Sequence, residues 1–131
     1  MPTHFIRRFQ GDERGTATVE SLLWMPLFFY LFVLITDVSF IFYGKAEALR
    51  IIQDGNRAYS VNSLETDTET SAYIKSRLVA LAPASEVTTS VVNGVIITTA
   101  TMQASDLMAV GSIPTFVDTE ISITSQHYME N

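Results

Sequence analysis

The chain contains no cysteine among its 131 residues, and it has few side chains suited to catalysis or metal binding. Without cysteine, disulfide bonds, thiolate nucleophiles and cysteine-based metal sites are excluded. The two histidines, His4 and His127, lie far apart without clustered carboxylates, which does not support a metal site. No serine lies in a nucleophile motif, and no glycine-rich loop could cradle a phosphate. The sequence therefore favours a protein that is not an enzyme and that uses no cofactor, metal or small-molecule substrate.

Charged residues are also scarce, at 17% of the chain, against about a quarter in a typical soluble domain. The deficit is concentrated in one stretch, because no residue from Ser21 to Thr36 is charged and apolar residues resume after Asp37. By contrast, residues 45–131 carry five basic and ten acidic side chains. An acidic domain without a basic stripe argues against nucleic acid as a partner and against docking on an anionic membrane surface.

Residues 16–44 predict a membrane-spanning helix, because about 20 mostly apolar residues suffice to cross a bilayer. A cleavable signal peptide is disfavoured, since the apolar part is longer than such a core and no A-x-A pattern follows it. Residues 1–15 are polar and carry one more basic than acidic side chain, which indicates a leader in the cytoplasm. We therefore expect residues 45–131 to form a domain on the other side of the membrane.

The predicted helix does not stop at the membrane, because helical periodicity continues through residues 45–60. One apolar face of this extension is formed by Ala48, Leu49, Ile52 and Tyr59. A single helix from Thr16 to Ser60 would be roughly 65–70 Å long at 1.5 Å per residue. Gly55 is the weak point of that extension.

After a loop at residues 61–66, a second helix is predicted from Asp67 to Ala82. Thr66 and Glu69 match a capping box, and Pro83 supplies a stop signal. The predicted buried face of this helix consists of Ile74, Leu78 and Leu81.

The remainder predicts an antiparallel sheet, which gives an α+β fold. Residues 86–92 and 95–102 are rich in β-branched side chains, and Asn93-Gly94 between them is a strong hairpin signal. Residues 104–114 are expected to be irregular, and a third strand is expected over residues 115–125. Its buried face would consist of Val117, Thr119, Ile121 and Ile123. The sheet should pack on the outer half of the long helix, because so small a domain cannot bury much core alone.

The most informative stretch is ERGTATVESLLWMP, residues 13–26. It contains a glycine after charged residues, four uncharged residues, a glutamate and then the apolar run, and it resembles the processing site of type IV prepilins. In that family a membrane peptidase cuts after the glycine, which is Gly15 here. The resemblance implies that Thr16 becomes the new N-terminus and that Glu20 becomes its fifth residue.

The subfamily that this stretch most resembles is the TadE-like pseudopilins of tight-adherence (Tad, type IVc) pilus systems. The matching features are Glu13-Arg14-Gly15, Val19-Glu20 and Pro26, together with the helix extension over residues 45–61 and the length of the chain. One departure is Ser21, where the family often has an aromatic residue. The resemblance implies a minor pilin in the bacterial inner membrane, with a cytoplasmic N-terminus and a periplasmic domain. It would act in pilus assembly or at the tip of a surface pilus.

The partners implied by the resemblance are a prepilin peptidase, other pilin-like subunits and membrane lipid. Glu20 would meet the terminal amine of a neighbouring subunit, since a carboxylate in hydrocarbon costs several kcal/mol unless it is paired. Pro26 would kink the helix or mark a site of local melting on assembly. Glu20 and Asp37 can also be interpreted as headgroup-level residues, or Asp37 as a partner contact. The alternative function is an uncleaved single-pass accessory subunit of another inner-membrane complex.

Overall fold

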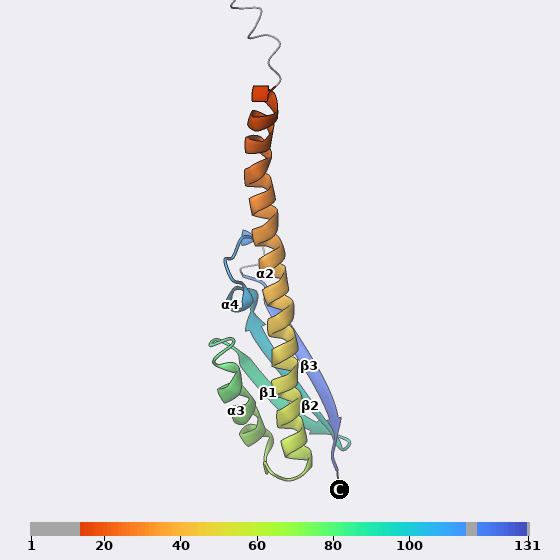
Figure 1. The fold of residues 1–131 in the computed structure, drawn as a ribbon. Helices are drawn as coiled ribbons and strands as arrows, with labels where there is room; N and C mark the ends of the chain where they lie inside the picture. The colour runs from red at the N-terminus through yellow and green to blue at the C-terminus, as the bar shows by residue number, and fades with distance from the viewer. Residues whose placement is uncertain (1–13, 115–117, 131) are drawn as a thin grey trace, which may run out of the picture.

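The computed structural model describes residues 14–114 and 118–130 and consists of one long helix with a small domain packed along its second half (Figure 1). In chain order the elements are α2 (Arg14–Ser60), α3 (Asp67–Leu78), β1 (Glu86–Val92), β2 (Val95–Gln103), α4 (Ala104–Leu107) and β3 (Glu120–Tyr128). The predicted α+β class is confirmed, with a long helix, one further helix and a three-stranded antiparallel sheet. The short α4 lies in the segment that was expected to be irregular. Most of the predicted leader, residues 1–13, lies outside the described residues.

Helix α2 is continuous over 47 residues, or roughly 70 Å at 1.5 Å per residue. It runs on through Pro26 and through Gly55, the residue expected to weaken it. Gly55 is buried against α3, and a Cβ added there would collide with the side chain of Ile74. The glycine therefore permits a close approach of the two helices, which offsets its low helix propensity.

The sheet has the order β1-β2-β3, and both pairs of strands are antiparallel. The β1–β2 hairpin turns at Asn93 and Gly94, whose φ angles of 52° and 77° are those of a type I′ turn. This confirms the predicted hairpin. Side chains of β2 alternate between buried and half-buried, so one face of the central strand is covered by the helices.

The core lies between that face of the sheet, the outer half of α2, and α3. Its fully or nearly fully buried apolar side chains are Ala48, Ile52, Ile74, Leu78, Ala82, Ala100, Met102, Leu107 and Ile123. Since these residues come from α2, α3, α4 and two strands, the long helix is an integral part of the domain. The small domain thereby gains the apolar surface that it could not bury alone.

Helix α3 begins as predicted but ends early. The Thr66 hydroxyl accepts a hydrogen bond from the Glu69 backbone N–H at 3.1 Å, while the Glu69 carboxylate accepts one from the Glu65 N–H at 2.9 Å. The helix ends at Leu78, where the sequence predicted Ala82. From there the N–H groups of residues 81 and 82 both donate to the Leu78 carbonyl, so the chain tightens into turns before it reaches the proline.

The prediction of the third strand was wrong in its bounds. Strand β3 spans Glu120–Tyr128, whereas residues 115–125 were expected. Of the predicted buried face, Ile123 is buried and Ile121 is half-buried, but Thr119 is exposed and precedes the strand. Val117 lies outside the described residues. The register explains the shift, because β3 pairs with the whole of β2, including its first residue, Val95. The polar end of β3 is acceptable because one face of this edge strand is open to water.

Candidate functional site: the exposed helix and its attachment to the domain

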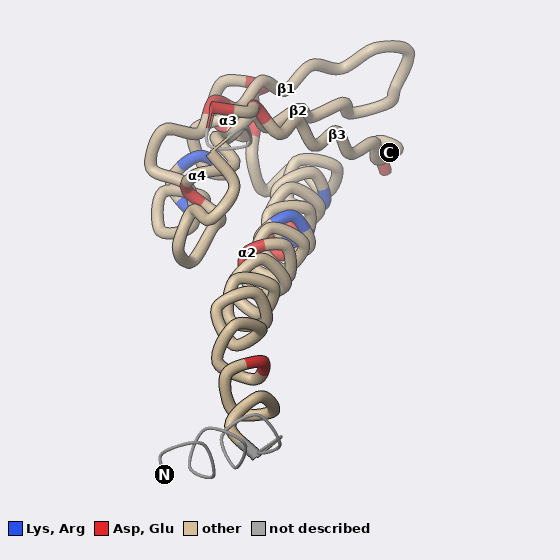
Figure 2. The backbone as a smooth tube through the Cα atoms, turned by 90° about the horizontal axis from the view of Figure 1, so that it is seen from above, with Lys and Arg blue, Asp and Glu red and all other residues tan. Residues whose placement is uncertain are grey.

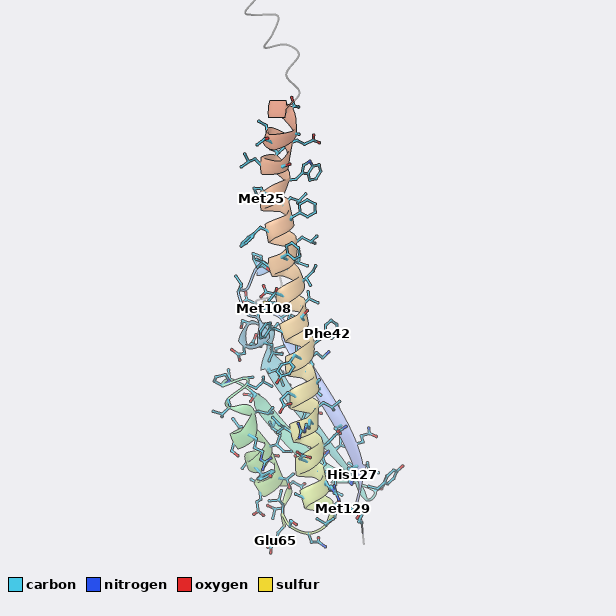
Figure 3. The ribbon with its side chains drawn as sticks, in the orientation of Figure 1. Met25, Phe42, Glu65, Met108, His127 and Met129 are labelled. Carbon is cyan, nitrogen blue, oxygen red and sulfur yellow. The ribbon has the colours of Figure 1, made fainter. Side chains whose placement is uncertain are left out.

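In the part of the chain that the structure describes, most side chains in the N-terminal half of α2 are exposed, and Val33 and Leu34 are half-buried. Its exposed large apolar side chains are Val19, Leu22, Leu23, Trp24, Met25, Leu27, Phe28, Phe29, Tyr30, Leu31, Phe32 and Ile35. They point outward on all sides of the helix, as the labelled Met25 does in Figure 3. The only charged residue between Thr16 and Thr36 is Glu20 (Figure 2). This helix is long and apolar enough to cross a membrane.

The length of the charge-poor segment matches a bilayer. From Thr16 to Thr36 the helix has 21 residues, or about 31 Å at 1.5 Å per residue. The hydrocarbon core of a bilayer is about 30 Å thick. The next residue, Asp37, makes polar contacts with the domain.

The residues of the predicted processing and packing motif lie along the first turns of α2. Gly15, Thr16 and Glu20 are all exposed, and a Cβ added at Gly15 would meet nothing within 4 Å. Glu20 has no hydrogen bond or ion pair with another described residue. It borders a shallow apolar groove in which the Trp24 and Phe28 rings lie with centroids 6.5 Å apart. The motif is therefore displayed on a bare helix surface rather than built into a folded pocket.

Asp37 attaches the domain to the helix, and its side chain is completely buried. One carboxylate oxygen accepts hydrogen bonds from the backbone N–H groups of Ala109 and Val110, at 3.1 and 2.8 Å. The other accepts from the N–H and the hydroxyl of Ser112, both at 2.6 Å. Hydrogen bonds to an ionised acceptor are among the stronger ones in proteins. The sequence suggested a headgroup-level residue or a contact with another subunit, yet these four donors come from the same chain.

Two helical turns further on, Gly44 is a second attachment point. A Cβ added at Gly44 would lie 2.6 Å from Cδ2 of Leu107 in α4, so only glycine lets α4 lie this close. Together, Asp37 and Gly44 hold the segment that follows β2 against one side of α2. Neither interaction was predicted from the sequence.

A buried polar network joins α2 to the sheet further out. The Thr98 hydroxyl donates to Oδ1 of Asn56 at 2.6 Å and is paired with the Thr89 hydroxyl at 3.0 Å. Nδ2 of Asn56 donates to the backbone carbonyl of Ser125 at 3.4 Å. Asn56 on the helix thus bonds directly to β2 and β3, and Thr98 extends the network to β1. The signal in the sequence was a polar residue within an otherwise apolar helix face, since Asn56 follows Ile52 by one turn.

At the outer end of α2, the hydroxyl of Tyr59 donates a hydrogen bond to the carboxylate of Asp67 at the start of α3. This hydrogen bond, together with burial and the negative charge of Asp67, raises the pKa of the Tyr59 hydroxyl. The contact ties the end of the long helix to the next helix across the connecting loop.

The described residues contain no group of three or more histidine, aspartate or glutamate side chains that could hold a metal ion. Most buried polar side chains form hydrogen bonds, and the hydroxyl of Ser85 is one that has no hydrogen-bond partner in the described part of the chain. The described residues thus form a long helix whose N-terminal half is apolar and exposed. A small domain is attached to the second half of this helix by buried hydrogen bonds and close packing.

In comparisons with known proteins, the chain matches no protein-family model, no curated protein and no solved structure. Its resemblance to TadE-like pseudopilins therefore depends on the residues of the N-terminal motif quoted above.

Proposed function

We propose that this protein is a pilin-like structural subunit, a TadE-like pseudopilin or minor pilin. The N-terminal half of α2 anchors it in the bacterial inner membrane, and a prepilin peptidase cuts it after Gly15. The domain lies on the periplasmic side and takes part in assembly of a Tad or type IV pilus, or sits at its tip. Its work is done by packing against other pilin-like subunits.

The observation that carries the proposal is the contrast between Gly15 and the other glycines of α2. Gly44 and Gly55 are explained by packing, because a Cβ at either would collide with a neighbouring side chain. Gly15 has no such reason, since a Cβ there would meet nothing within 4 Å. The packing of the fold therefore does not explain why position 15 is a glycine. Cleavage by a peptidase that requires a glycine before the cut would explain it.

Glu20 supports the same function. It is an exposed carboxylate on the membrane-spanning part of α2, and no described residue neutralises it. Such a group costs several kcal/mol in a bilayer unless it is paired. Cleavage after Gly15 creates an α-amino group at Thr16 that is cationic at neutral pH. The amine of one subunit and Glu20 of its neighbour would then form the missing pair and set the axial register of packed helices.

The exposed apolar surface of α2 supplies the rest of the packing. In the membrane it faces lipid, and in a filament the same side chains face the helices of other subunits. Pro26 removes one backbone donor from this segment, so the carbonyl one turn before it lacks its usual helical partner. We place local loosening of the helix during assembly at this position.

The test is the intact mass of the protein purified from its native host. The expected mass lacks residues 1–15 and leaves Thr16 as the N-terminus. A Gly15→Leu variant should keep the full mass, while Ser21→Leu, which adds a leucine at an exposed position inside the mature helix, should be processed normally. Full mass for the unaltered protein in a host with active peptidase would overturn the proposal and favour an uncleaved accessory subunit of another inner-membrane complex.

A further inference from the structure

Among the described residues of the domain, those of the segment after α4, residues 108–114, lie closest to the N-terminal end of α2 (Figure 1). Its sequence, MAVGSIP, contains no charged residue. The side chain of Val110 is 68% exposed although it is apolar, and Met108 lies beside α2 in Figure 3. In an otherwise acidic domain, this loop is an uncharged tip directed along the helix toward the anchor.

Three N–H groups of the loop backbone are paired with a buried carboxylate, which lowers the cost of moving this part of the loop out of water. The N–H groups of Ala109, Val110 and Ser112 all donate to the Asp37 carboxylate, as does the Ser112 hydroxyl. Irregular backbone cannot normally enter a bilayer, because its unpaired polar groups cost several kcal/mol each. Here three backbone donors of the tip, at residues 109, 110 and 112, are already satisfied by a buried side chain of the helix.

The height of the loop along α2 matches the edge of the proposed membrane span. Asp37 directly follows the charge-free stretch that ends at Thr36. At this level α2 also exposes the aromatic rings of Phe40, Phe42 and Tyr43, of which Phe42 borders a recess between the helix and the domain. Tyrosine, the type of residue at position 43, is enriched at the boundary between hydrocarbon and headgroups.

The apolar surface also continues from the helix into the domain at this level. A recess of about 350 Å³ lies between Val38 and Ile41 of α2 and the side chains of Ile113 and Ile121. Lys45 is the one charged residue among the side chains that line it. The uncharged loop, the mostly apolar recess and the exposed aromatic rings lie near the same level of α2 and form a surface suited to lipid.

We propose that loop 108–114 is a second membrane contact, which inserts Val110 into the outer boundary of the bilayer beside the anchor. The contact rests on the proposed membrane anchoring of α2 and adds to it a fixed orientation of the domain above the lipid surface. It needs no anionic lipid, because the loop has no positive charge with which to attract one. The occupant of this surface is the bilayer itself.

The absence of cysteine makes the test direct, since single cysteines can be introduced and labelled with an environment-sensitive fluorophore. Three variants are compared in the full chain reconstituted in phosphatidylcholine vesicles: Val110→Cys, Val92→Cys and Phe29→Cys. Val92 is the matched control, because it is an exposed valine (51%) on β1, and Phe29, 72% exposed, reports on the anchor. The readouts are the emission maximum and quenching by aqueous iodide.

We expect labels at positions 29 and 110 to emit further to the blue than the label at 92 and to be quenched several-fold less by iodide. A label at 110 that behaves like the one at 92, while position 29 is shielded, would overturn the loop contact and leave the anchor intact. If position 29 is also open to iodide, the anchor fails, and the loop contact fails with it.

A second measurement avoids the bulk of the label. The chain has one tryptophan, Trp24, so Val110→Trp in a Trp24→Phe background places the only indole in the loop. Lipids brominated near the top of their acyl chains should quench its fluorescence. Emission that is unchanged by brominated lipid would contradict the insertion of the loop, whatever the outcome with the larger fluorophore.

Discussion

Replacing Asp37 with alanine should release the loop after α4 from the long helix while the rest of the domain stays folded. The substitution removes the acceptor of four hydrogen bonds, three from backbone N–H groups and one from the Ser112 hydroxyl. A hydrogen bond to a charged group contributes about 1.5–3 kcal/mol net. The four are not additive, and the freed loop regains hydrogen bonds with water. We therefore expect a local loss of about 2–4 kcal/mol rather than the full sum.

The assay is hydrogen exchange at the amides of Ala109, Val110 and Ser112 in detergent or lipid. Since about 1.4 kcal/mol corresponds to a factor of ten, exchange at these three amides should accelerate roughly 30- to 1,000-fold. Amides of the β1–β2 hairpin should keep their protection. Asp54→Ala is the matched control, because Asp54 is an exposed aspartate on the same helix and its loss should leave the loop unchanged.

Asp37→Asn separates geometry from charge. The amide keeps one acceptor oxygen, so it can accept hydrogen bonds from two of the four donors. Its NH2 group cannot accept hydrogen bonds from the other two. Loop exchange should therefore fall between that of the native protein and that of Asp37→Ala. Native exchange rates in Asp37→Ala would refute the reasoning, since they would mean that the carboxylate does not hold the loop.

The remaining predictions concern the packing of α2. Gly55→Ala should lower the melting temperature of the domain by forcing Ile74 to move, at a cost of about 1–3 kcal/mol, whereas Gly15→Ala should leave it unchanged, because the added methyl meets nothing. Asn56→Leu should destabilise by about 1–3 kcal/mol, because the Thr98 hydroxyl loses its buried acceptor. Adding Thr98→Val to that variant should cost less than the sum of the two single changes, and a fully additive pair in thermal denaturation would count against the network.

Helix periodicity, capping and turn preferences were sufficient to predict the elements that depend on contacts between residues close together in the sequence. The long helix followed from the apolar run and from the periodicity that continues beyond it, and the hairpin followed from Asn93-Gly94. The start of α3 followed from the hydroxyl of Thr66. In each case the deciding contacts join residues close together in the sequence, and propensity and capping describe such contacts.

The attachment of the domain was not predictable in this way, because its contacts join distant parts of the chain. Asp37 is 72 to 75 residues from its donors, and the backbone N–H groups among them carry no side-chain signal. Gly44 became informative only once Leu107 was placed against it. The third strand shows a related limit, since the alternation of apolar residues fits residues 115–125 as well as it fits the observed β3. Pairing with β2 decided the register. The pattern of apolar residues along one strand does not specify which residues of the neighbouring strand it pairs with.

The long helix meets two different environments, and its composition changes where they meet. Before Asp37 its side chains are mostly large, apolar and uncovered, whereas beyond it Gly44, Ala48 and Gly55 allow the domain to lie close against the helix. A buried carboxylate at the junction connects the two regimes and leaves little freedom between anchor and domain. Under the proposed function this rigidity has a use. When Glu20 sets the axial register of neighbouring helices, the attached domains take up matching positions. The spacing of the helices then also determines the spacing of the domains at the outer surface of the assembly.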